Sequence, residues 1–173
     1  RMKRVGLFGS SVNPPTGVGG HVSIVKYFSG IFDEIWIFPV YNHIFDSKRG
    51  TLVSYDHRME MSRLAFASID NAKVISVEKD VYMERNQAKG EDGFPERIGT
   101  YDIVKYLENA RPDAVFTLIL GADTFHDILE GKWKHGDWLL KHLKFCVIDR
   151  HGSENLQEYI QEHKNVTLHD IDE

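Results

Sequence analysis

Short runs of apolar residues recur along the chain, and longer stretches of mixed polarity separate them. Nearly every position in these runs is apolar; they cover residues 5–8, 35–38, 74–77, 115–120, 145–148 and 166–168. Strands have this continuous apolar character when both faces of their sheet are covered, as in parallel sheets. We therefore predict six strands, of which the last is short.

The stretches between the runs have the spacing of amphipathic helices. We predict helices at 21–32, 100–109, 123–129, 138–143 and 153–163. One more helix begins at Ser54 or Asp56, because either residue can cap a helix N-terminus. Its buried face is predicted to carry Met61, Leu64, Ala65 and Ile69. The long polar segments 40–53 and 82–99 are predicted loops of functional length.

Alternating strands and helices form right-handed βαβ units around a parallel sheet. The fold class is therefore α/β: we predict a single Rossmann-like domain over 1–173, with a doubly wound parallel sheet and helices on both faces. Such sheets bind ligands at the carboxyl ends of their strands, where the strand order reverses. The segments after 5–8 and 115–120 are the candidates for that position.

The composition narrows the classes of partner. The chain has 173 residues, 42% of them hydrophobic, and a net charge of −5, and no run of Lys and Arg exceeds two residues. We therefore predict neither nucleic acid nor a membrane as a partner, while a homo-oligomer stays open. Cys146 is the only cysteine and lies in an apolar run, so it is expected to be a buried structural thiol. A reducing compartment follows, the cytoplasm or alternatively the nucleus.

The first predicted strand runs into a segment rich in Gly, Ser and Pro, and His21 follows where a helix begins. A helix N-terminus presents unpaired N–H groups and a dipole that favours an anion, so this segment suits a phosphate. A turn that needs glycine for its backbone alone would give the same pattern.

Four segments in order strengthen the phosphate interpretation. The first has Gly9-Ser10-Ser11, Asn13-Pro14-Pro15-Thr16 and His21; the second has Pro39-Val40, Lys48, Gly50, Leu52, His57-Arg58 and Met61; the third has Gly121-Ala122-Asp123 and Trp133-Lys134; the fourth has Arg150-His151-Gly152. Together they resemble the nicotinamide/nicotinate mononucleotide adenylyltransferases of the nucleotidylyltransferase superfamily, over about residues 4–152. The resemblance implies an enzyme that transfers the adenylyl group of ATP to either mononucleotide, giving a dinucleotide and pyrophosphate.

The resemblance also implies roles for individual residues. The catalytic group would be His21, Thr16 and Lys48. ATP would be bound by Gly9, Ser10, Ser11, His21, Gly121, Asp123 and Arg150, and the mononucleotide by Asn13, Lys48, Arg58, Thr100 and Trp133. The mononucleotide phosphate is already an anion, so the reaction needs alignment and charge neutralisation rather than a base, and Mg²⁺ enters with ATP. No protein metal site is predicted.

Plainer interpretations exist for several of these residues. His21 could begin a helix in solvent, Trp133 could be a core aromatic, and Asp123 could cap the following helix. Lys48 and Arg49 could be a solvated pair, and the acidic residues from Glu78 to Glu96 are expected to be a solvated stretch rather than a metal cluster.

The chain departs from the family pattern at three places. Thr16 stands five positions before His21, where the family has three, and Met83 stands where the family has a tryptophan. The family's closing I-S-S-T-x-x-R segment is not found before Glu173, which suggests a domain without its C-terminal phosphate-binding segment. The alternatives are therefore another nucleotidylyltransferase, for pantetheine phosphate or a cytidylyl group, or an inactive nucleotide-binding module. The preference between the acid and the amide mononucleotide stays open.

The resemblance predicts the effect of removing His21. If its imidazole contacts charge that develops on the phosphates, His21→Ala should lower kcat by roughly 100-fold, about 3 kcal/mol of barrier, with a much smaller change in KM. Steady-state kinetics of dinucleotide formation measure both constants. Retained turnover would show that the longer segment before His21 moves the ring away from the phosphates.

Overall fold

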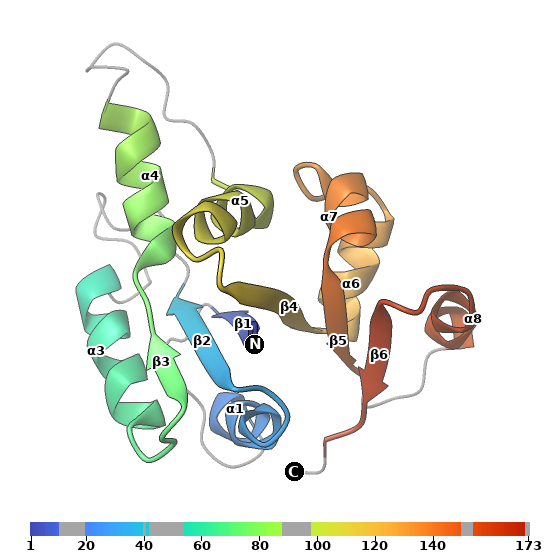
Figure 1. Cartoon of the computed structure of the whole chain (residues 1–173), viewed down its shortest axis with the longest axis horizontal. Helices are drawn as coiled ribbons and strands as arrows, with labels where there is room; N and C mark the ends of the chain where they lie inside the picture. The colour runs from blue at the N-terminus through green and yellow to red at the C-terminus, as the bar shows by residue number, and fades with distance from the viewer. Residues whose placement is uncertain (11–19, 40, 42–53, 88–97, 150–153, 172–173) are drawn as a thin grey trace.

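In the computed structural model, residues 1–10, 20–39, 41, 54–87, 98–149 and 154–171 are described (Figure 1). Six strands in these ranges form one sheet: β1 (Lys3–Ser10), β2 (Glu34–Pro39), β3 (Ala72–Val74), β4 (Ala114–Gly121), β5 (Lys144–Ile148) and β6 (Val166–His169). Their order is β3-β2-β1-β4-β5-β6, and every neighbouring pair is parallel. The predicted parallel α/β fold is confirmed, and the strand order reverses between β1 and β4.

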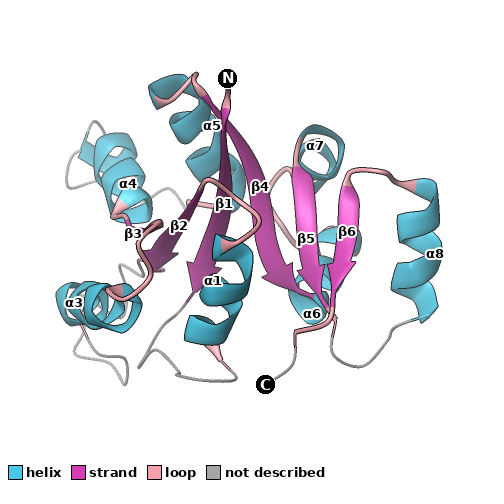
Figure 2. Cartoon of the chain, turned by 60° about the horizontal axis from the view of Figure 1, so that its bottom comes forward, coloured by secondary structure: helices cyan, strands magenta, loops and turns pink. Residues whose placement is uncertain are grey.

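Helices cover both faces of this sheet (Figure 2). They are α1 (His21–Ser29), α3 (Tyr55–Phe66), α4 (Val77–Gln87), α5 (Thr100–Ala110), α6 (Ala122–Leu129), α7 (Gly136–His142) and α8 (Glu154–Glu162). Buried residues of α1 and α3 pack in one apolar cluster, and those of α4 to α8 pack in another. The chain thus has the two helical layers that a doubly wound sheet requires.

The strands supply both clusters in alternation. In β2, Trp36 and Phe38 belong to the cluster under α4 to α8, whereas Ile35 and Ile37 belong to the cluster under α1 and α3. Successive side chains of a strand point to opposite faces, so a strand between two helical layers must be apolar at every position. This requirement explains the continuous apolar runs in the sequence. Cys146 lies in the cluster under α1 and α3. It is buried as expected, and burial raises the pKa of its thiol.

The segment after β3 differs from the prediction. The strand ends at Val74 rather than at residue 77, and the helix α4 occupies Val77–Gln87, which includes part of the predicted loop 82–99. Only Val77 and Val81 are buried on this helix, so it has too few apolar positions to show a periodic pattern. A local signal was present, because the Ser76 hydroxyl donates to the Asp80 carboxylate (2.9 Å) at the start of the helix.

Two predicted helices needed smaller corrections. The α1 helix ends at Ser29 rather than at residue 32, with Gly30 as its C-cap. Ser54, not Asp56, caps α3, since its hydroxyl accepts from the His57 N–H (3.4 Å). The predicted buried face of α3 was wrong at Leu64, which is 70% exposed, whereas Ala65 and Ile69 do pack against the apolar cluster, Ile69 from beyond the helix end. The buried residues are instead Tyr55, Arg58, Met59, Ser62 and Phe66.

A buried carboxylate lies at the amino end of the sheet. Glu34, at the start of β2, pairs with Lys3 of β1 and with Lys73 of β3 (2.7 Å), and it accepts from the Trp36 indole N–H (2.9 Å). Burial alone would raise the pKa of Glu34, but the three hydrogen bonds outweigh it and hold the pKa at about 2. Glu34 therefore ties three adjacent strands together.

Glu34→Gln should reveal this contribution as a pH-dependent loss of stability. The folded pKa lies below the ordinary value of 4.5, so the carboxylate stabilises the fold above that pH and loses its effect as the pH falls toward 2. The variant should lose about 3 kcal/mol of unfolding free energy at pH 7, with a shrinking difference from wild type at pH 4 and pH 3. Urea unfolding at each pH measures it, and Glu60→Gln, which removes an exposed carboxylate, should change little. A pH-independent difference would contradict the account.

Candidate active site

A cavity of about 440 Å³ lies where the strand order reverses, at the carboxyl ends of β1 and β4. Its walls come from β1, β2, β4, the first turn of α5 and the first turn of α6; the lining residues are Phe8, Gly9, Phe38, Glu78, Thr100, Ile103, Leu118, Ile119, Leu120, Gly121, Thr124 and Trp133. This is the place where open parallel sheets bind ligands.

Two glycines bring the backbone to this cavity. A Cβ at Gly9 would lie 2.7 Å from the Phe38 ring, so only glycine lets β1 pass Phe38 this closely. Gly121 ends β4 and is also the N-cap of α6, where it has an extended backbone. The helix that starts here presents N–H groups of its first turn next to the cavity. Both glycines were predicted to bind ATP, and the structure brings them together at one end of the sheet.

His21 flanks the cavity. It is the first residue of α1, and its ring centroid lies 5.9 Å from that of Phe8, which lines the cavity. Burial lowers the pKa of His21, which favours the neutral imidazole at pH 7. His21 is thus a half-buried residue at the start of a helix rather than a fully exposed one.

A second cavity of about 360 Å³ adjoins the first. Its lining residues are Glu78, Ile98, Gly99, Thr100, Lys132, Trp133 and Lys134. Because Glu78, Thr100 and Trp133 line both cavities, the two cavities are neighbours that share these three residues. The sequence analysis predicted that Thr100 and Trp133 both bind the mononucleotide, and both residues line this cavity.

The turn that carries Trp133 has a defined backbone. Gly131 adopts φ 79° just after α6, and His135 adopts φ 52° just before α7. The Gly136 N–H donates to the Trp133 carbonyl (3.1 Å), and the His135 ring lies 4.3 Å from that of Tyr101. A left-handed residue other than glycine needs such surrounding contacts. The indole is thus presented from a constrained turn.

Glu78 is the site residue that sequence reasoning placed wrongly. It was expected in a solvated acidic stretch, yet it is half-buried, lines both cavities and accepts from the Tyr41 N–H (2.9 Å). Burial raises the pKa of Glu78 to about 7, although the Tyr41 hydrogen bond and the charge of Arg58 act in the opposite direction. Strongly shifted carboxyls of this kind gather at functional sites. Its apolar neighbours Val77 and Val81 were the only sequence signal for its burial.

Other predicted residues lie outside the cavity walls. Arg58 is 1% exposed on α3, its guanidinium 5.6 Å from the Tyr55 ring centroid, and it lines neither cavity. Asp123 is exposed in the first turn of α6, beside Thr124, which does line the cavity and was not predicted. The predictions for Ser11, Asn13, Thr16, Lys48 and Arg150 fall outside the described residues, as does the side chain of Ser10.

Comparison with known proteins places the chain in a family. Residues 7–170 match the family model described as cytidylyltransferase-like, a class of nucleotidyltransferases. The chain is 32% identical over 155 residues to the nicotinate-nucleotide adenylyltransferase of Bacillus subtilis, an alignment that covers 87% of this chain and 71% of the relative. A probable nicotinate-nucleotide adenylyltransferase of Bacillus licheniformis is 29% identical, with the same two shares covered. The chain therefore belongs to the cytidylyltransferase-like family, within the nicotinate-nucleotide adenylyltransferases.

Solved structures give the same fold at lower identity. Nicotinic acid mononucleotide adenylyltransferase of Plasmodium falciparum, complexed with NaAD, aligns with a TM-score of 0.69 at 18% identity and covers 99% of this chain and 76% of its own. A putative nicotinate-nucleotide adenylyltransferase from Vibrio parahaemolyticus aligns with a TM-score of 0.65 at 20% identity, over 93% of this chain and 82% of its own. Among the described residues, no helix is long and apolar enough to cross a membrane.

The raised pKa of Glu78 predicts a stabilising substitution. The folded state favours the protonated carboxyl of Glu78. Its contribution to the free energy of unfolding is therefore fully present below the ordinary pKa of 4.5 and is lost as the pH rises through the folded pKa of about 7. The side chain of Glu78→Gln is neutral at every pH. At pH 8 the free energy of unfolding of this variant should therefore exceed that of wild type by about 3 kcal/mol, and at pH 4 the two should be equal. Chemical denaturation at the two pH values tests this. Glu84→Gln, an exposed carboxyl of the same helix, is the control, and a gain at pH 4 equal to that at pH 8 would contradict the assignment.

Proposed function

We propose that this chain transfers the adenylyl group of ATP to a pyridine mononucleotide, with nicotinate mononucleotide as its preferred acceptor. The observation that carries the proposal is the two-part cavity at the point where the strand order reverses. Each part has a volume within or near the range of small-molecule sites, and Trp133 lines both. The relatives named for nicotinate nucleotide adenylylation support the acid as the acceptor.

The two parts suit the two substrates. Gly9 and Gly121 bring backbone N–H groups and the N-terminus of α6 to the first cavity, which suits the phosphates and ribose of ATP. The flat indole of Trp133 suits the pyridine ring, and Thr100 offers a hydroxyl beside it. Asp123, one residue before Thr124, would reach the ribose from the rim.

The proposed reaction is an in-line displacement. A phosphate oxygen of the mononucleotide attacks the α-phosphorus of ATP, a new P–O bond forms, and the bond to pyrophosphate breaks. The nucleophile is already ionised, so the protein needs to align the two substrates and neutralise charge. A neutral His21 would donate a hydrogen bond to the phosphates as charge develops there.

We further propose that magnesium arrives as the ATP complex. Among the described residues, no group of three or more His, Cys, Asp or Glu side chains could hold a metal ion. The phosphates of ATP are themselves good oxygen ligands for Mg²⁺. Cys146 is buried and is the only cysteine of the chain, which is consistent with a reducing compartment such as the cytoplasm.

A parallel assay tests the proposed function. Purified protein is given ATP and Mg²⁺ with nicotinate mononucleotide, nicotinamide mononucleotide or phosphopantetheine, and both pyrophosphate and the dinucleotide are measured. We expect dinucleotide from the pyridine substrates, with the higher kcat/KM for the acid. Faster turnover of phosphopantetheine would contradict the proposal. Binding of ATP without turnover of any acceptor would instead indicate an inactive nucleotide-binding module.

The role of Trp133 has its own test. Trp133→Ala should raise the KM of the mononucleotide about fivefold, because a stacked ring contributes on the order of 1 kcal/mol, and should spare the KM of ATP. Trp133→Phe, which keeps an aromatic face, should restore most of the loss. Equal weakening of both substrates would show that the indole supports the cavity rather than contacting the pyridine.

A further inference from the structure

Asp102 is a fully buried carboxylate beneath the second cavity. It lies in the first turn of α5, two residues after Thr100, and its side chain has no exposed surface. It lines neither cavity, and the predicted chemistry gives it no role. A charge buried this deeply is costly unless it is paired and hydrogen-bonded, so its partners define what it does.

Three groups from three segments converge on this carboxylate. The Gly99 N–H donates to Oδ2 (2.9 Å), which caps α5. The Arg85 guanidinium on α4 lies 2.7 Å from Oδ1. The Lys134 ammonium lies 3.1 Å from Oδ2 and 3.3 Å from Oδ1. A cap alone would need only the first of these contacts.

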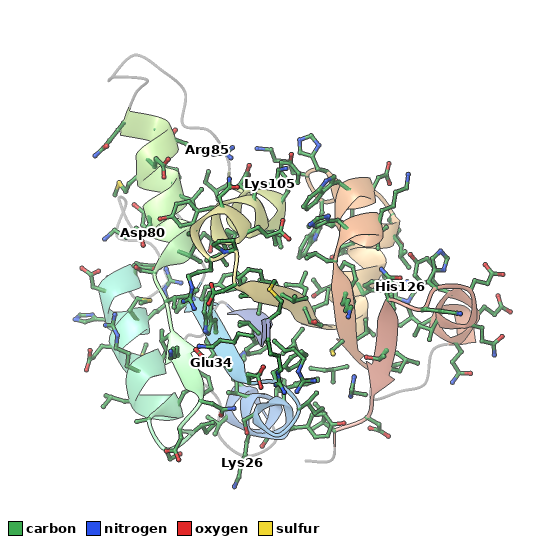
Figure 3. All side chains as sticks on the ribbon, in the orientation of Figure 1. Lys26, Glu34, Asp80, Arg85, Lys105 and His126 are labelled. Carbon is green, nitrogen blue, oxygen red and sulfur yellow. The ribbon has the colours of Figure 1, made fainter. Side chains whose placement is uncertain are left out.

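The segments that meet at Asp102 also form the walls of the second cavity. Arg85 is on the helix that carries Glu78, Gly99 precedes Thr100, and Lys134 follows Trp133. In Figure 3, Arg85 extends from α4 toward α5, in agreement with its ion pair. Lys134 also packs against Gly99, where an added Cβ would lie 3.4 Å from the lysine Cβ.

The two cations are only partly withdrawn from water. The Arg85 and Lys134 side chains are 34% and 35% exposed, whereas the carboxylate between them is fully buried. Without Asp102, none of these three contacts would join α4 to the Trp133–Lys134 turn. The carboxylate is thus the element that the three contacts share.

We propose that Asp102 is a positioning residue that sets the spacing of Glu78, Thr100 and Trp133 by holding α4 and the Trp133–Lys134 turn against the first turn of α5. This inference rests on the proposed function only for its kinetic consequence. The clasp of Asp102, Arg85 and Lys134 can be tested in the free protein. It predicts that the mononucleotide side of the site, whose cavity alone is lined by Gly99 and Lys134, depends on Asp102 more strongly than the ATP side does.

The first test needs no substrate. Asp102→Asn keeps the shape of the side chain and removes its charge, and Lys134→Met removes one cation. In both variants, backbone amides of residues 77–87 and 131–135 should exchange hydrogen faster than in wild type. The control is Asp113→Asn, which breaks an exposed pair with Arg111 (3.0 Å) at the other end of α5. It should leave exchange in both segments unchanged.

The second test is kinetic. Misplacing a binding wall by about 1 Å can cost a large factor, so Asp102→Asn should raise the KM of the mononucleotide about tenfold and change the KM of ATP less than twofold. Lys134→Met should shift the same ratio in the same direction by a smaller factor, and Lys134→Arg should restore it. Asp113→Asn should leave the ratio at the wild-type value.

The outcomes separate the two proposals. Unchanged exchange in both segments, or a lower melting temperature with an unchanged ratio of KM values, would overturn the positioning role and leave Asp102 as a helix cap. If Asp102→Asn fails to fold, hydrogen exchange of residues 77–87 in Lys134→Met and Lys134→Arg decides, because Lys134 itself lines the second cavity and its KM effect does not separate positioning from direct contact. If wild type turns over neither pyridine mononucleotide, the proposed function fails, while faster exchange in the variants would still establish the clasp.

Discussion

The parallel pairing of β4 with β1 is the constraint on which the site depends. After β3 the chain returns across the sheet, and β4 pairs with β1 from Lys3 and Ala114 up to Phe8 and Ile119. This pairing sets Gly9 and Gly121 side by side at the carboxyl end and directs α1 and α6 away from the same edge. Because β1 and β4 are covered on both faces, their apolar clusters hold the edge in place. The cavity is therefore a product of strand order, to which the loops and helices add chemistry.

Three carboxyl groups show how differently this fold treats buried charge. Glu34 has two lysines and an indole N–H, and its pKa falls to about 2. Asp102 has an arginine, a lysine and a backbone N–H, and it joins three segments near the site. Glu78 accepts one backbone hydrogen bond in a wall of the cavity, and burial raises its pKa to about 7. The first two carboxylates stabilise the fold around them. The third destabilises the fold when it is ionised, and it does so at the site.

Much of this architecture could be predicted because buried strands are visible in the sequence as continuous apolar runs. The runs at 5–8, 35–38 and 145–148 lie inside β1, β2 and β5, since a central parallel strand needs apolar residues on both faces. Gly9, Gly121, Thr100 and Trp133 could be joined because the family pattern places them in order, and the structure brings all four to one cavity.

The rest could not be predicted because it depends on tertiary contacts between polar residues. The α4 helix buries only Val77 and Val81, so its polar positions are typical of a loop, and the burial of Glu78 followed that error. Asp102 resembles an ordinary helix cap in sequence, since Arg85 and Lys134 are brought to it only by folding. On α3, Met59 and Phe66 are buried and Leu64 is exposed, a choice that helix periodicity alone left ambiguous.

A crystal structure of the chain with a bound nicotinate dinucleotide would test the central claim most directly. We expect the pyridine ring against Trp133 in the second cavity, the phosphates at the carboxyl ends of β1 and β4, and the adenosine beside Gly121. A dinucleotide bound with its phosphates away from Gly9 and Gly121, or with its pyridine ring outside the walls formed by Glu78, Thr100 and Trp133, would contradict the account.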